Sequence, residues 1–139
     1  MIYVPFPSLS NGERIERSEF VDISDITSLS ESFKAAEINV ASRIRILQYQ
    51  DRPILVVEGD SSKVVAVFAD SSELVPKLTV ENSRDIAEKF SDSLVISVSD
   101  QIMYDQWVVH DRFDPYRPFF RVDLDDEDRT HLYVSTKTT

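Results

Sequence analysis

The sequence contains no cysteine and only two glycines, Gly12 and Gly59. Without cysteine there is no disulfide, no thiolate metal site and no cysteine nucleophile. Two isolated glycines cannot build a glycine-rich phosphate loop, which excludes P-loop and Rossmann nucleotide sites. The sequence also lacks a run of about 20 apolar residues, the length of a membrane span. Residues 1–7 lack the basic region and apolar stretch of a signal peptide.

Basic residues are scarce. Fifteen Lys and Arg stand against 25 Asp and Glu, giving a formal net charge of −10. A nucleic-acid site needs a basic face that displaces counterions from phosphates, and an anionic membrane surface repels an acidic protein. We therefore expect no nucleic-acid partner, and membrane association only through segments flanking this chain. The acidity suits solubility or a basic protein partner.

Hydrophobic residues make up 42% of the 139 residues, which is enough for the core of one domain or two very small ones. Residues 1–24 contain two early prolines and a turn at 10–12, so we expect an irregular lead-in with a short strand near 3–6. A helix is expected after Asp25 or Thr27. Its apolar residues recur with helical spacing, and Ser28 with Glu31 resembles a capping box.

A second helix is predicted to begin at Thr79, a good N-cap residue, with an apolar stripe of Val80, Ile86, Ala87 and Phe90. Several segments have the alternation or β-branched composition of strands. They are residues 43–48, 53–58, 63–69, 94–98, 106–109, 119–124 and 131–135. The turn at 59–62 predicts a hairpin between the second and third of these.

These elements occur in the order helix and three strands, followed by a helix and further strands. Residues 52–57 and 117–122 both begin with Arg-Pro and align at an offset of 65 residues. At that offset Val67 aligns with Leu132 and Phe68 with Tyr133. A duplication accounts for these matches better than coincidence does. The second copy differs by a longer link that contains residues 103–116.

The predicted fold class is therefore α+β, with tandem α-β-β-β repeats and antiparallel sheets that carry helices packed on one face. The first repeat is expected over residues 25–78 and the second over 79–139. Each repeat alone has little core, so we expect the two to form one compact domain together.

At these motifs the sequence resembles the PepSY family. The first copy has Arg-Pro with an apolar strand at residues 52–57, followed by an apolar strand at 64–69. The second copy has Tyr-Asp-Gln-Trp at 104–107, Arg-Pro at 117–118 and Leu-Tyr-Val-Ser at 132–135, which resembles the membrane-anchored subgroup. The first copy departs from the family pattern because its last strand is not closed by Thr-Gly. The second ends at Thr139, where the pattern continues with Gly.

The resemblance implies a domain on the periplasmic side of the inner membrane, in a parent protein with flanking transmembrane helices. The wider family is linked to control of proteases, and anchored members to envelope functions such as iron–siderophore handling. The family has no agreed catalytic residues, so the resemblance supplies no catalytic site and no cofactor.

Two groups of residues are candidates for a metal or catalytic site. The acidic run at Asp123 and 125–128 carries enough carboxylates for Ca²⁺ but lacks the spacing of an EF-hand loop, and a solvated hairpin tip is the plainer interpretation. His110 and His131 have no zinc or triad spacing, so surface or edge positions are expected. No nucleophile elbow occurs. We therefore predict that the chain is not an enzyme and binds no metal or cofactor.

The aromatic link of the second copy is the best functional candidate. An aromatic-rich link forms either a partner-binding groove or a cap over the open end of a sheet. Nearby arginines could receive a carboxylate or pair with local acids. The predicted partner or ligand surface consists of Tyr104, Trp107, Arg112, Phe113, Tyr116 and Arg117.

Three functions remain open from the sequence. The leading hypothesis is a non-catalytic binding or regulatory domain of a membrane-anchored PepSY protein, acting on a protein partner or on its own transmembrane helices. The alternative is a free-standing acidic inhibitor or immunity-type protein that neutralises a protease or a basic toxin. The third is an enzyme or part of one, such as a membrane reductase whose haem ligands lie outside this segment.

Overall fold

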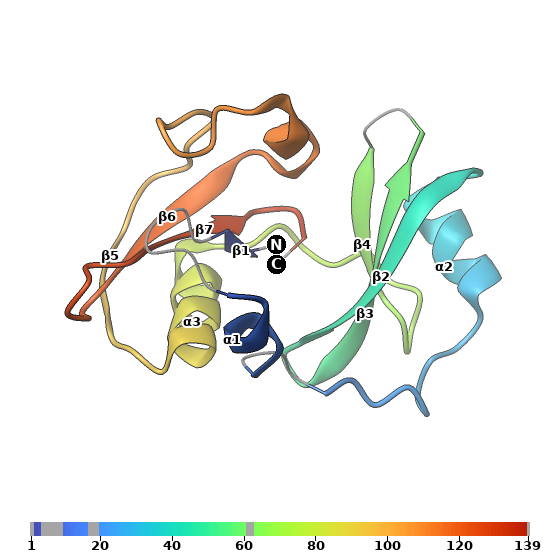
Figure 1. Cartoon of the computed structure of the whole chain (residues 1–139). Helices are drawn as coiled ribbons and strands as arrows, with labels where there is room; N and C mark the ends of the chain where they lie inside the picture. The colour runs from blue at the N-terminus through green and yellow to red at the C-terminus, as the bar shows by residue number, and fades with distance from the viewer. Residues whose placement is uncertain (1, 4–9, 17–19, 61–62, 139) are drawn as a thin grey trace. The chain divides into compact units, whose positions relative to one another are not determined.

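The computed structural model describes residues 2–3, 10–16, 20–60 and 63–138 (Figure 1). The chain divides into two compact units. The first unit is Glu19–Lys77, and the second is Leu78–Lys137 together with Met1–Ser18. The division at Leu78 lies close to the predicted start of the second repeat. The expectation that both repeats form one compact domain concerns the relation between the units and stays a prediction.

The first unit consists of one helix and a three-stranded antiparallel sheet of order β2-β3-β4. Helix α2 is Leu29–Ala36, and the strands are β2 (Ala41–Tyr49), β3 (Arg52–Gly59) and β4 (Val64–Phe68). The predicted hairpin between β3 and β4 is confirmed by their antiparallel pairing, and residues 61–62 of its turn lie outside the described residues.

Helix α2 packs on β3 and β4 because alternate strand residues point toward it. Leu55, Val57 and Val67 are fully buried in a core cluster that includes Ala36 and Ile38. Burying a side chain of this size contributes about 1.5–3 kcal/mol, so this cluster accounts for much of the stability of the first unit. Ser28 is the N-cap of α2, but its side chain makes no capping hydrogen bond, so the predicted capping box is wrong.

The second unit contains a four-stranded antiparallel sheet of order β1-β7-β6-β5. Its elements are β1 (Ile2–Tyr3), α1 (Asn11–Glu16), α3 (Val80–Ser91), β5 (Val95–Val98), the 3-10 helix η1 (Asp111–Tyr116), β6 (Phe119–Leu124) and β7 (His131–Ser135). The fold class is thus α+β, as predicted.

The N-terminal residues were predicted as an irregular lead-in with a short strand near 3–6; the structure has a short strand at Ile2–Tyr3 and, unlike the prediction, a helix. Strand β1 joins the second unit's sheet, with Ile2 opposite Val134 and Tyr3 opposite Tyr133. Residues expected to form a turn start helix α1, which Ser10 and Glu13 cap reciprocally through backbone N–H and side-chain oxygens at 2.8 and 3.3 Å. Residues 4–6 of the expected first strand lie outside the described residues.

Helix α3 begins as predicted, with Thr79 as its N-cap. The Thr79 hydroxyl accepts a hydrogen bond from the Asn82 backbone N–H, and the Asn82 side chain accepts one from the Thr79 backbone N–H. The helix packs on β5, β6 and β7. Its fully buried face consists of Ser83 and Ala87, whereas Val80 from the predicted stripe is 39% exposed.

Each unit has a helix followed by three antiparallel strands, and the two hairpins close alike. Ala69 donates its backbone N–H to Pro53 O, and Thr136 donates to Pro118 O. The offset of 65 residues, however, fails on the last strands, because Ile54 pairs with Phe68 whereas Phe119 pairs with Ser135. The β6–β7 hairpin is longer than its counterpart. The shared element order is compatible with duplication, which stays a prediction.

Candidate functional site

The predicted aromatic link runs between β5 and β6, and much of it lacks regular secondary structure. A single bridge between Ile102 and Phe119 fixes its start, and η1 forms its last third. The strand predicted at residues 106–109 is wrong. This segment turns, with the Val108 N–H donating to Asp105 O, and Val108 is completely buried while Val109 is exposed. The aromatic and β-branched residues of this segment are typical of a strand, but no described strand lies beside it to pair with.

Arg117 fixes the shape of the link from within. Only 2% of its side chain is exposed. The guanidinium donates hydrogen bonds to the carbonyl oxygens of Met103, Val108 and His110, and it pairs with Asp114. A buried guanidinium is tolerated only when its donors are satisfied, and here one cation satisfies carbonyls from three points of an irregular segment.

Two further residues of the predicted surface are buried as well. Phe113 is 4% exposed and meets Phe119 edge to face, with ring centroids 6.2 Å apart. Tyr116 is 7% exposed, and its carbonyl oxygen accepts a 2.6 Å hydrogen bond from the Ser135 hydroxyl. Phe113, Tyr116 and Arg117 therefore line no accessible surface. They attach the link to β6 and β7, which is the cap-over-the-sheet interpretation of this region.

The remaining predicted residues are exposed. Tyr104 is 64% exposed and Trp107 is 43% exposed, and Arg112 is exposed with its guanidinium 4.8 Å from the Phe113 ring centroid. Sequence reasoning missed two neighbours, Met103 and Val109, each 52% exposed. We call this set the link surface: Met103, Tyr104, Trp107, Val109 and Arg112. The Arg117 guanidinium lies 4.3 Å from the Tyr104 ring centroid, so the buried cation also makes a cation–π contact with one residue of the link surface.

A chain of polar contacts attaches the link to the sheet at a second place. The Tyr133 hydroxyl donates a 2.9 Å hydrogen bond to Asp105 Oδ2. Burial, followed by this hydrogen bond, raises the pKa of the Tyr133 hydroxyl. Arg121 Nη1 lies 3.7 Å from Asp105 Oδ2, and its Nε lies 3.1 Å from Asp123 Oδ1. The sequence motifs that contain Tyr133 and Arg121 did not indicate this contact with Asp105, because it depends on tertiary structure.

Asp123 continues this chain toward the edge of the sheet. Ser97 Oγ lies 2.7 Å from Asp123 Oδ2, and His131 Nδ1 lies 2.7 Å from Asp123 Oδ1. Burial opposes ionisation of Asp123, but the hydrogen bond from Ser97 and the charges of Arg121 and His131 hold its pKa below the usual value. His131 therefore begins β7 as a partner of a strand carboxylate.

The other candidate ligands are spread apart. His110 is exposed at the start of η1, beside a shallow open hollow of about 370 Å³ lined by residues 109–112. Asp125–Asp128 form the predicted hairpin tip, where Asp126 Oδ1 accepts the Thr130 N–H at 2.7 Å. Within the described residues, no group of three or more His, Asp or Glu side chains is arranged to hold a metal ion.

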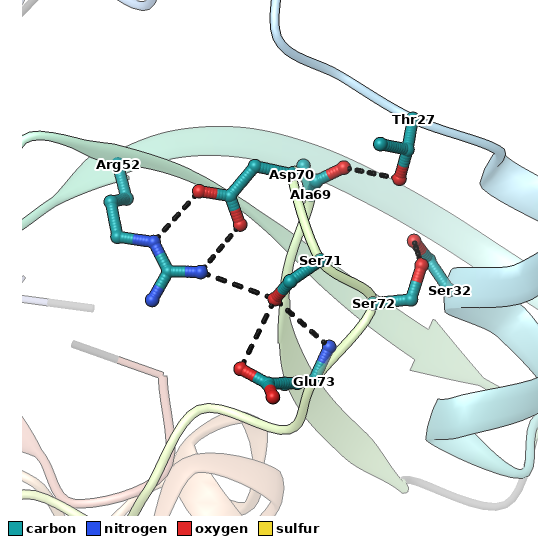
Figure 2. A network of polar contacts seen from close by, with 8 residues as sticks. All are labelled: Thr27, Ser32, Arg52, Ala69, Asp70, Ser71, Ser72 and Glu73. Carbon is teal, nitrogen blue, oxygen red and sulfur yellow. Dashed lines mark hydrogen bonds and ion pairs between the residues drawn. The ribbon is translucent and has the colours of Figure 1, made fainter.

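The first unit holds its own polar network at the end of β4 (Figure 2). Arg52 Nε and Nη2 donate to the two carboxylate oxygens of Asp70 at 2.7 and 2.6 Å, and Nη2 also reaches Ser71 Oγ at 3.1 Å. The guanidinium lies 3.8 Å from the Phe68 ring centroid. The hydrogen bonds from Arg52 lower the pKa of Asp70. Both carboxylate oxygens of Asp70 accept hydrogen bonds from Arg52, so this network joins the start of β3 to the end of β4.

No protein-family model matches the chain, no curated protein resembles it in sequence, and no solved structure resembles its fold. The PepSY resemblance therefore depends on the sequence motifs alone. No helix in the described ranges is long and apolar enough to cross a membrane.

Proposed function

We propose that the chain is a non-catalytic binding module that contacts a protein partner through its link surface. The observation that carries this proposal is that four large side chains are exposed on a segment whose backbone is held by hydrogen bonds. Met103, Tyr104, Trp107 and Val109 are between 43% and 64% exposed, on a segment whose backbone is bonded from within by the buried Arg117.

Such an arrangement suits recognition for an energetic reason. Aromatic and methionine side chains are enriched where proteins bind one another, and Trp and Tyr dominate the binding energy of many interfaces. A flexible loop would lose entropy on binding, whereas a loop already held in one shape loses little. Exposing four apolar side chains costs solubility, so a partner that covers them is the simplest account of their placement.

We further propose that this module is a PepSY-like domain on the periplasmic side of the inner membrane, within a membrane-anchored parent protein. The helix-and-three-strand order of both units and the Arg-Pro pairs before β6 and at the start of β3 support this. The parent reading frame tests it directly: a transmembrane helix encoded on at least one side of residues 1–139 is expected. A frame without any such helix contradicts the anchored form and favours the free-standing acidic inhibitor.

Site-specific crosslinking in the source cells tests the binding surface. A photoreactive amino acid replaces Trp107, and the matched control replaces Leu94, which is 72% exposed but lies outside the link surface. We expect one discrete adduct from position 107 that is absent from position 94 and is lost when Tyr104→Ala is added. Equal adducts from both positions, or none from position 107, would show that the link surface is not an interface.

A further inference from the structure

Strand β2 forms one edge of the first unit's sheet and is its longest strand, with nine residues. It pairs with β3 along its length, from Ala41 opposite Gly59 to Tyr49 opposite Arg52. Among the described residues, no other strand pairs with β2. An unpaired edge presents a row of backbone N–H and C=O groups to which another extended chain can add.

The opposite edge of the same sheet is protected. Residues 73–75 run along β4, where Phe68 N–H donates to Glu73 O and Val75 N–H donates to Ala66 O, both within 2.9 Å. A bridge joins Val67 and Leu74. One edge of this sheet is thus covered by residues 73–75, whereas no strand among the described residues pairs with the longer edge, β2.

The two faces of β2 differ in chemistry. On the helix side, Ile44 and Ile46 lie opposite the fully buried Val57 and Leu55, yet they remain 42% and 43% exposed. The two isoleucines thus continue the apolar core to the edge of the sheet, where a large part of each side chain is exposed. An added strand would cover both isoleucines if it placed apolar side chains on the same face.

The other face of β2 carries arginines. The Arg43 side chain is 64% exposed, with Nη1 3.9 Å from Glu58 Oε2, and Arg45 Nη2 lies 3.0 Å from Glu58 Oε1. Both guanidiniums thus share the carboxylate of Glu58. Carboxylates on an incoming strand, next to the exposed Arg43, would form favourable cross-strand pairs.

We propose that the β2 edge binds an extended acidic peptide segment, with alternating apolar and carboxylate side chains, as an added strand of the sheet. The apolar side chains cover Ile44 and Ile46, and the carboxylates face Arg43 and Arg45. A second copy of this chain fits less well. Two joined β2 strands would bring arginines close to arginines and would add no carboxylates to pair with them. This surface lies in the first unit and is independent of the link surface.

Two synthetic peptides test the proposal with the intact chain. One alternates glutamate and valine, and the other alternates lysine and valine at equal length. Fluorescence anisotropy should show binding of the glutamate peptide at least about fivefold tighter than the lysine peptide, the size expected for one or two cross-strand charge pairs. Hydrogen exchange should show new protection of backbone amides within 41–49 when the glutamate peptide is present.

Charge reversal provides the matched controls. Arg43→Glu should remove the preference for the glutamate peptide, and Arg43→Gln should reduce it. The control, Arg129→Glu, makes the same charge change at an exposed position in the other unit and should leave binding unchanged. Circular dichroism confirms that each variant folds. Equal binding of both peptides, or an Arg43→Glu variant that keeps the preference, would overturn the proposal. Dimers with protected residues 41–49 in the absence of peptide would overturn it as well, because a second copy would then occupy the edge.

Discussion

The hydroxyl of Tyr133 in β7 donates a 2.9 Å hydrogen bond to the carboxylate of Asp105 in the link. The two residues are 28 positions apart in the chain, and the ring of Tyr133 is completely buried against Phe119. A strand residue thus holds an irregular segment in place, and together with Arg117 it keeps the link surface in one conformation.

Removing the Tyr133 hydroxyl should loosen the link without emptying the core. We expect Tyr133→Phe to lower the stability of the second unit by about 1 kcal/mol, because the ring remains and Asp105 keeps its contact with Arg121. Hydrogen exchange should show faster exchange of amides within 99–110. Unchanged exchange in this segment would mean that the hydrogen bond does not hold the link.

The same residue predicts an alkaline effect. The pKa of Tyr133 is raised in the folded chain above the value of 10.0 for an unperturbed tyrosine. Above about pH 10 the unfolded chain therefore releases this proton first, and stability falls as pH rises. We expect the wild-type chain to lose more stability between pH 9 and about pH 11 than Tyr133→Phe does, as measured by urea unfolding at each pH. Equal losses would contradict the assignment.

Arg117 should be among the most sensitive positions of the second unit. Arg117→Ala leaves three carbonyl oxygens without their donor, whereas Asp114 is half exposed and can be hydrated. We expect a loss of about 2–4 kcal/mol, from the unsatisfied carbonyl oxygens and the lost packing of the buried side chain. Arg117→Lys should recover only part of this, since an ammonium cannot reach three separated carbonyls as a planar guanidinium does. Thermal unfolding measures both. As the control, Arg112→Ala at an exposed site should change stability by less than about 0.5 kcal/mol.

The two helices offer a matched pair of N-caps. Thr79→Ala should destabilise the second unit by about 1 kcal/mol, because its hydroxyl accepts the Asn82 N–H. Ser28→Ala should have little effect, since the Ser28 side chain makes no capping hydrogen bond. Urea unfolding of both variants gives the comparison. A Ser28→Ala loss as large as that of Thr79→Ala would show that Ser28 caps α2 after all.

The Arg52–Asp70 pair should show an acid-dependent coupling. Arg52 lowers the pKa of Asp70 below 3.8, so the stabilisation is present above about pH 4 and is lost as pH falls through the folded-state pKa. A double-mutant cycle with Arg52→Ala and Asp70→Ala should give about 1 kcal/mol at pH 7, a modest value because both side chains are partly exposed. The coupling should vanish near pH 2, and a coupling that persists there would contradict an ionic origin.

The amino-acid sequence determined the fold class and most element positions. The Val- and Ile-rich run at 53–58 and the apolar residues at 119–124 marked central strands of the two sheets, and Thr79 marked the start of α3, since these signals arise from local geometry. The absence of cysteine and the scarcity of glycine excluded whole classes of site for reasons of covalent chemistry alone. Aromatic clustering also singled out the link at residues 103–116 as a region of interest.

Only the tertiary structure decided which side chains of that link are exposed. Phe113 and Tyr116 read like Tyr104 and Trp107 in the sequence, yet packing on β6 and β7 buries the first pair and leaves the second at the surface. Arg117 looked like a surface arginine, because nothing local shows that carbonyl oxygens from Met103 to His110 converge on it. Burial depends on contacts between distant segments, and a single sequence reports only the contacts that local periodicity imposes.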